Sequence, residues 1–485
     1  MKRILIAGLV ASALSACNTT NNTDVGTSAV ATSTATTPKN VIFFLGDGMG
    51  MTTMTAARIY AVGEDGDLTM DTLPETAFIK TYSNDAQVTD SAPSMAAYMT
   101  GVKMNNEVIS MSSDTQAVDA KGNAYLNGTD SLCPTTNGKS VPTLLEIAKA
   151  AGLATGVVTT TRVTHATPAT TYAHVCHRDA ENDIAAQLVP NGKGFNTALG
   201  GGVDIVLGGG SQFFLPTSAK GKRTDGRDLV AEMKTLGYTY VSNKDELKAA
   251  DPTKTKLFGL FSSSHMSYDL DRTADAANKE PSLAEMTVKA IQGLKKGEKG
   301  MFLMVEGGRI DHALHETTAK KALQDTVAFD NAIKAAIDEV KKTDPELKNT
   351  LIVVTADHDH TLVLNGYAKR TGKSTATNPG VLGLVKDVVG TKATLDADGM
   401  PYTIIGFGNG ENRAQGDRKT FAALDDGAVF ANTYHQEAAI RVGAGSETHG
   451  GTNVFLGAIG KGSDQFYGVM DNTNVFKLVR SAVGL

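Results

Sequence analysis

Residues 304–315, with the sequence MVEGGRIDHALH, bring acidic and imidazole side chains to the passage from an apolar strand to a helix. The carboxylates are those of Glu306 and Asp311, and the imidazoles are those of His312 and His315. Oxygen and nitrogen ligands without thiolates suit Zn²⁺ and Mg²⁺. The segment therefore predicts a metal site.

Three further segments repeat this pattern of an apolar run that ends in acidic or imidazole groups. Asp47 follows the first run, Asp357 and His358 follow the second, and His449 lies in the third segment. A single Asp-x-x-x-His spacing more often marks a solvated helix face than a pair of metal ligands. Four such segments in one chain reverse that balance and favour metal binding.

The spacing of the first segment predicts one zinc site. Asp311 and His315 are four residues apart at the start of a helix, so both side chains point to one face. His449 can complete the set of three ligands from a distant loop.

A second zinc site, and a third site for a harder metal ion, are predicted around Asp47. Asp357 and His358 are adjacent at a strand end, where irregular backbone can turn both inward, and Asp47 completes their set. Glu306, Thr167 and the other oxygen of Asp47 offer the oxygen ligands that Mg²⁺ prefers.

Ser91 stands where a loop enters a helix, in the sequence VTDSAPSMAA. One interpretation makes Ser91 the N-cap of that helix, with Pro93 in the first turn. The other makes it a nucleophile that a metal ion activates, with the helix N-terminus supplying donors for an attacked phosphate. From this segment alone the cap is the simpler interpretation.

Short apolar runs alternate with helical patterns along most of the chain, which is typical of strands joined by helical crossovers. We expect strands at 41–45, 154–159, 203–207, 256–261, 300–305, 350–355 and 453–458, and helices at 51–62, after 91, at 142–151, 282–295 and 312–342. This order predicts an α/β fold with a large, mostly parallel central sheet and helices on both faces. Ligands of such sheets lie outside the carboxyl ends of the strands, where the acidic and imidazole groups fall.

The 485 residues exceed what one simple core usually carries and predict one large α/β domain with insertions, or two domains. We expect one catalytic domain over residues 40–485, with an inserted surface subdomain at about 365–445, where the alternation weakens. The net charge of −6 and the scattered lysines indicate no specific nucleic-acid binding.

The N-terminus has the layout of an export signal. Residues 1–17 carry a basic start, an apolar run and the ending Leu-Ser-Ala-Cys, which resembles a lipoprotein box and predicts acylation of Cys17. Ordinary cleavage beside a chance cysteine is the alternative. Residues 18–39 are rich in Thr, Ser and Asn and predict a flexible linker. In an exported compartment Cys133 and Cys176 form a disulfide or remain two free buried thiols, and the sequence does not decide between these.

Several segments together strongly resemble the alkaline phosphatases, from about residue 39 to the C-terminus and in the order of that family. They are residues 46–50, 89–92, 100–103, 160–169, 305–315, 355–358 and 447–451, and residues 401–403 and 408–410 resemble the insertion of the animal-type and marine-bacterial branch. The resemblance implies hydrolysis of small phosphate monoesters at alkaline pH, two Zn²⁺ and one Mg²⁺ per chain, and a homodimer.

The resemblance also implies roles for individual residues. Ser91 would be the nucleophile that becomes phosphoserine, and Arg178 would hold two phosphate oxygens, with a surface ion pair as the alternative interpretation of Arg178. His165 and His312 would lie around the magnesium site; they replace Asp and Lys of some bacterial members, a change that can shift metal preference toward Co²⁺. His360 has no implied ligand role and is interpreted as a satisfied imidazole.

Two other classes of function stay open. A phosphodiesterase or a sulfatase can share this metal architecture, and the Ser-Ala-Pro-Ser sequence at Ser91 partly matches a sulfatase signature, which Met95 breaks. A lipoprotein that binds metal or phosphate without turnover would keep the ligands and would not need Ser91. The expected location is the bacterial periplasm or cell surface, with a membrane contact only through the lipid on Cys17.

Overall fold

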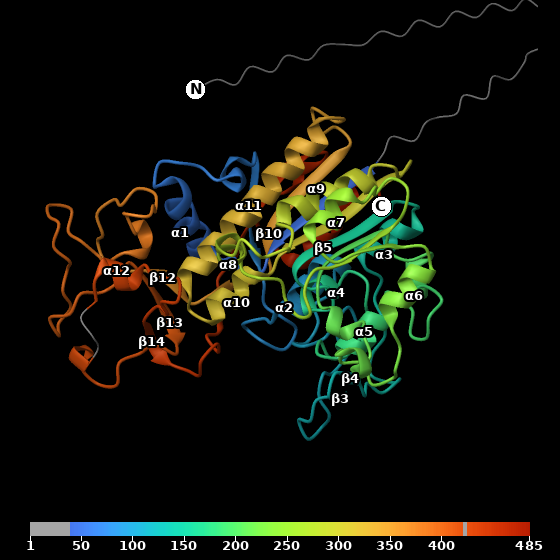
Figure 1. Ribbon diagram of the computed structural model, residues 1–485, viewed down its shortest axis with the longest axis horizontal. Coiled ribbons are helices and arrows are strands. Elements are labelled where there is room, and N and C mark those ends of the chain that lie inside the picture. The colour runs from blue at the N-terminus through green and yellow to red at the C-terminus, as the bar shows by residue number, and fades with distance from the viewer. Residues whose placement is uncertain (1–38, 421–423) are drawn as a thin grey trace, which may run out of the picture. The chain divides into compact units, whose positions relative to one another are not determined.

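The computed structural model describes residues 39–420 and 424–485, and its centre is a sheet of ten strands (Figure 1). The strand order is β17-β2-β16-β10-β1-β9-β5-β6-β8-β7. Their bounds are β1 Lys39–Gly46, β2 Glu75–Lys80, β5 Ala154–Arg162, β6 Ile205–Gly209, β7 Thr239–Val241, β8 Leu257–Leu260, β9 Gly300–Gly307, β10 Thr350–Ala356, β16 Val454–Gly460 and β17 Gly468–Asp471. Only β16 pairs antiparallel with its neighbours, so the sheet is mostly parallel, as predicted.

Helices cover both faces of this sheet. The strands β1, β9 and β10 are buried along almost their whole length, as the near-continuous apolar sequences of strands in parallel sheets require. One group of helices is α1 Met51–Val62, α9 Leu283–Leu294 and α11 Ala319–Lys341, and the other is α2 Ser91–Thr100, α3 Leu144–Ala150 and α13 Asn472–Val483. Each group packs together and contacts the central strands, which confirms the predicted α/β architecture.

The predicted long helix at 312–342 is wrong, because the structure contains two helices there. Helix α10, Arg309–His315, ends before Thr317, whose φ of 54° lies in the left-handed region. The Thr318 amide and hydroxyl both donate to the carbonyl of Ala313, at 2.9 and 3.1 Å, and this closes α10. The break leaves His315 in the last turn of α10.

A second, three-stranded sheet, separate from the central one, begins just before the region at about 365–445 and continues within it. It consists of β12 Leu362–Leu364, β13 Ile405–Gly410 and β14 Ala438–Arg441, with the short helix α12 Asp426–Val429 nearby (Figure 1). The remaining helices are α4 Ala166–Ala169, α5 Glu181–Gln187, α6 Leu229–Thr235, α7 Lys244–Ala249 and α8 Asp269–Ala274. The limits of an inserted subdomain stay a prediction.

The predicted signal segment, its Cys17 and the linker up to residue 38 lie outside the described residues. Lys39, which we predicted as the last linker residue, instead begins β1. Among the residues that the structure describes, no helix is both long and apolar enough to cross a membrane.

Candidate metal centre and nucleophile

The strand register brings the predicted ligands to one edge of the sheet. In β1, Gly46 lies opposite Gly307 of β9 on one side and Ala356 of β10 on the other. All three strands run parallel, so the residues that end them meet at the same place. Asp47, Glu306 and Asp357 come from these ends and are buried with no measurable exposure.

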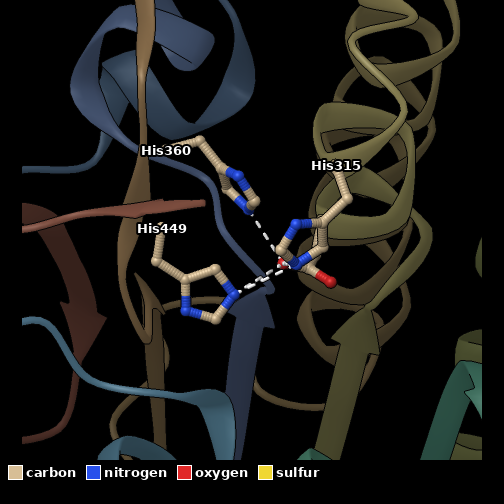
Figure 2. A group of neighbouring side chains, drawn as sticks. His315, His360 and His449 are labelled. Carbon is tan, nitrogen blue, oxygen red and sulfur yellow. Dashed lines mark hydrogen bonds and ion pairs between the residues drawn. The ribbon is translucent and has the colours of Figure 1, made fainter. Parts of the chain in front are cut away.

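Four side chains converge in a first cluster: Asp311, His315, His360 and His449 (Figure 2). The Nε2 atom of His315 lies 3.2 Å from Oδ1 of Asp311, and that of His449 lies 3.5 Å from the same oxygen. The two Nε2 atoms of His315 and His449 are 3.1 Å apart. This convergence of nitrogen and oxygen atoms is the donor set that Zn²⁺ takes in proteins.

His360 is the member of this cluster that the sequence interpretation missed. Its Nε2 lies 2.8 Å from Oδ1 of Asp311, and its Nδ1 lies 2.5 Å from Oε2 of Glu447. The short strands β11, Asp359–His360, and β15, His449–Gly450, pair His360 directly with His449. The alternation Asp-His-Asp-His at 357–360 was the available signal, because residues two apart in a strand share a face.

A second cluster surrounds the hydroxyl of Ser91. Its Oγ donates to Oδ1 of Asp47 at 3.3 Å and lies 3.1 Å from Nε2 of His358. The same His358 nitrogen is 3.4 Å from Asp47 and 3.5 Å from Oδ2 of Asp357. Asp47 and His358 also group with Asp311 of the first cluster, so the two clusters adjoin.

A third group of possible ligands lies beside the second cluster and consists of oxygen atoms of Asp47, Thr167 and Glu306. The Thr167 hydroxyl lies 3.3 Å from Oδ2 of Asp47, and His165 shares this group. Oxygen ligands of this kind suit Mg²⁺. Glu306 Oε2 also accepts from the hydroxyl of Thr161 at 3.0 Å.

Unpartnered carboxylate oxygens show that these clusters fit metal ions. Oε1 of Glu306 and Oδ2 of Asp357 are buried without a hydrogen-bond partner in the described protein. Burial and the nearby charge of Asp47 hold the pKa of Glu306 and the pKa of Asp357 well above the usual carboxyl range. Several buried carboxylates so close together need bound cations to stay ionised.

Ser91 does not cap α2, and that interpretation is wrong. The N-cap is Asp90, whose Oδ1 accepts from the backbone amide of Ala92 at 2.7 Å. Ser91 is the first residue of the helix, 2% exposed, and its hydroxyl is left free to face the metal ligands.

Arg178 lies beside the N-terminus of α2 and is mostly buried rather than on the open surface. Its Nη1 donates to Oδ1 of Asp90 at 2.9 Å and its Nη2 lies 3.1 Å from Nε2 of His165. The chain that carries it is held by a disulfide between Cys133 and Cys176. Through Asp90, the N-cap of α2, the guanidinium is held next to the helix turn that carries Ser91.

His165 and His312 lie together, and a third ring, His265, joins them. The ring centroids are 5.4 Å apart for His165 and His312, and 4.2 Å apart for His265 and His312. Sequence reasoning missed His265, because no metal-ligand spacing relates it to the other histidines.

Comparison with known proteins agrees with this arrangement. The family model described as "Alkaline phosphatase" matches residues 38–485. The tissue-nonspecific alkaline phosphatase of Rattus norvegicus is 37% identical over 90% of this chain and 82% of its own length. The crystal structure of Thermus thermophilus alkaline phosphatase has a TM-score of 0.64 and 26% identity, covering 93% of this chain and 92% of that one. A mutant of the bacterial TAB5 alkaline phosphatase, solved with Mg bound, has a TM-score of 0.62 at 24% identity and covers 93% of this chain and 99% of that one.

Proposed function

This chain belongs to the alkaline phosphatase family and is a metal-dependent hydrolase of phosphate monoesters, and we propose that it works through a phosphoserine formed on Ser91. The observation that carries the proposal is the Ser91 hydroxyl, which lies within 3.3 Å of Asp47 and 3.1 Å of His358 at a helix N-terminus. Arg178 beside it supplies the cation that a phosphate dianion requires.

The ligand sets that we propose are two for Zn²⁺ and one for Mg²⁺, with Co²⁺ as an alternative occupant. Asp311, His315 and His449 would hold the first zinc ion, and His360 would orient Asp311. The second zinc ion would take the set of Asp47, Asp357 and His358, and the magnesium ion that of Asp47, Thr167 and Glu306. The unpartnered oxygens of Glu306 and Asp357 support these sets.

When bound, the ions acidify the serine hydroxyl and water and stabilise the charge of the entering and leaving oxygens. Arg178 binds two phosphate oxygens with its planar fork and orients the phosphorus toward Ser91. The Ser91 oxygen forms a bond to phosphorus as the ester bond breaks, and the alcohol leaves with a proton. Water then attacks the phosphoserine, phosphate departs, and Ser91 recovers its hydroxyl.

An assay of ester classes tests the proposed function. The protein without residues 1–17 is incubated with a chromogenic phosphate monoester, a phosphate diester and a sulfate ester, each with Zn²⁺ and Mg²⁺ and each with a chelator. We expect the monoester to be hydrolysed fastest, and only with the metals present. Faster turnover of the diester or the sulfate would assign the chain to another esterase class, and no turnover would favour a binding lipoprotein.

The pH–rate profile with saturating metals should have an alkaline optimum. Ligand imidazoles bind metal only when they are deprotonated, and the attacking water must also lose a proton. Activity should therefore rise from pH 6 into the alkaline range, a trend that a series of buffers at constant ionic strength would record. A maximum near pH 5 would contradict the mechanism.

We also propose that the chain is exported and anchored to a membrane by a lipid on Cys17, and that it forms a homodimer. Its disulfide between Cys133 and Cys176 suits an oxidising compartment. Tyr367 and Val389, between about 365 and 445, are 97% and 92% exposed, which leaves these apolar side chains accessible to a second copy.

A further inference from the structure

A group of cationic and imidazole side chains lies at the edge of the metal centre, outside the proposed ligand sets. We call Arg162, His265, Arg309 and His312 the basic cluster. Nη1 of Arg309 lies 2.7 Å from Nδ1 of His312, and Nη1 of Arg162 contacts Nε2 of His265. Because a guanidinium can only donate, these ring nitrogens accept, and the cluster has more donors than acceptors.

Arg309 has a charge that no neighbouring acid neutralises at close range. Within residues 39–420 and 424–485, no carboxylate oxygen lies within 4.0 Å of its guanidinium nitrogens, and its Nε is buried without a partner. Its guanidinium instead stacks on the ring of Tyr268, 3.7 Å from the centroid. Arg162, by contrast, is paired with Glu181 at 2.7 Å.

The charge of Arg309 acts on the buried carboxyl group of Asp325, but Asp325 does not cancel that charge at neutral pH. Burial and the charge of Asp269 raise the pKa of Asp325 to about 8, even though Arg309 opposes the shift. Burial, together with His312 and Arg162, also lowers the pKa of His265, so this ring stays neutral beside the guanidiniums. Arg309 is therefore the group in this cluster whose positive charge has no close partner near pH 7, while Glu181 pairs with Arg162 and Asp311 lies 4.0 Å from His312.

The basic cluster lies next to the phosphate-binding groups. His165 contacts Arg178 at 3.1 Å, and its ring is 5.2 Å from that of His265 and 5.4 Å from that of His312. One imidazole therefore separates Arg178 from the cluster. The His312 side chain is 18% exposed and Arg309 is half-buried, so part of the cluster is open to solvent.

From this geometry we propose that the basic cluster is a second anion subsite, which binds a carboxylate or second phosphate on the alcohol part of a phosphate monoester through Arg309. The proposal rests on the proposed function, since it names a substrate class for the same centre. A divalent cation at the same place is less favourable, because the surrounding guanidiniums repel it and already occupy the ring lone pairs.

The test compares two substrates that share a skeleton. 3-Phosphoglycerate carries a carboxylate where glycerol 3-phosphate carries a hydroxymethyl group. The selectivity ratio, defined as kcat/KM for the first divided by kcat/KM for the second, is measured at pH 7 for the metal-loaded wild type, Arg309→Met and Arg309→Lys. Losing a charge-assisted hydrogen bond should lower the ratio about tenfold in Arg309→Met. Arg309→Lys, which keeps the charge, should lose less.

A second pair of variants guards against misfolding of Arg309→Met. His265→Glu places a negative charge in the basic cluster and should lower the ratio, whereas His265→Gln should keep it near that of the wild type. Equal ratios in these two variants, or an unchanged ratio in Arg309→Met, would overturn the subsite. So would loss of a bound metal ion from Arg309→Met, measured by elemental analysis, since Arg309 would then act through the metal centre.

The two proposals fail in different ways. If the metal-loaded wild type hydrolyses neither substrate, the proposed function is wrong, and the anion subsite falls with it. If it hydrolyses both, and the ratio does not depend on Arg309 or on the charge at residue 265, the proposed function stands and the subsite is wrong.

Discussion

Replacing Ser91 with alanine should lower kcat for a phosphate monoester by about 10³-fold or more, the scale expected when a covalent nucleophile is removed. The Ser91 hydroxyl faces Asp47 and His358 and is not used to cap α2, a role that Asp90 fills. The variant should therefore keep its fold and its metal ions while losing the atom that attacks phosphorus. Steady-state kinetics, together with metal analysis of the same sample, measure this effect.

Ser94→Ala is the matched control, because it removes the same hydroxyl from the same helix. The Ser94 hydroxyl donates to the backbone carbonyl of Asp357 at 2.6 Å and does not face the metal ligands. The Ser94→Ala variant should therefore lose far less activity than Ser91→Ala.

Acid quenching of the wild type during turnover should also yield a phosphorylated peptide that contains Ser91. Substantial turnover by Ser91→Ala would contradict the phosphoserine pathway and favour direct attack by water.

Removing the metal ions should abolish activity and lower the Tm by roughly 10 °C, because ions that bind only the folded state stabilise it. The loss should be larger at alkaline pH. Burial favours the neutral form of His358, but Asp357, Asp47 and Asp311 together outweigh burial and raise the pKa of His358 to about 9. Burial also favours the neutral form of His360, but Glu447 and Asp311 together outweigh burial and raise the pKa of His360 to about 10.

The sign of this pH dependence follows from proton binding. From the ordinary histidine pKa of 6.5 to about 10, the metal-free folded state holds protons on His358 and His360 that the unfolded chain releases. Stability therefore falls as pH rises through this range. A bound metal replaces the proton of His358, which belongs to a proposed ligand set, so the stability of the metal-loaded protein should depend less on pH.

Calorimetry of the chelated and reloaded protein at pH 6.5, 8 and about 10 measures both effects. The difference in Tm between the two forms should widen as pH rises. Full recovery of activity and Tm after Zn²⁺ and Mg²⁺ are returned is the control for irreversible damage. A difference in Tm that stays constant with pH would show that these imidazoles are not linked to metal binding.

The sequence alone was enough to predict the α/β fold, the family and the segments that build the metal centre. Strand and helix patterns have short periods, and a parallel sheet collects its strand ends at one edge, so Asp47, Glu306 and Asp357 were predictable neighbours. The family and the fold are confirmed. The roles of single residues within the centre stay predictions.

Other features depended on contacts between segments that are distant in the chain, which no local pattern encodes. His360 joined the first cluster because β11 pairs with β15. His265, in the loop after β8, reached His312 of α10 only through tertiary packing. The helix expected at 312–342 breaks at Thr317, where closing bonds to Ala313 outweigh helix propensity. Tertiary structure decided these points, because hydrogen bonds and buried charge are satisfied across the whole fold rather than along the chain.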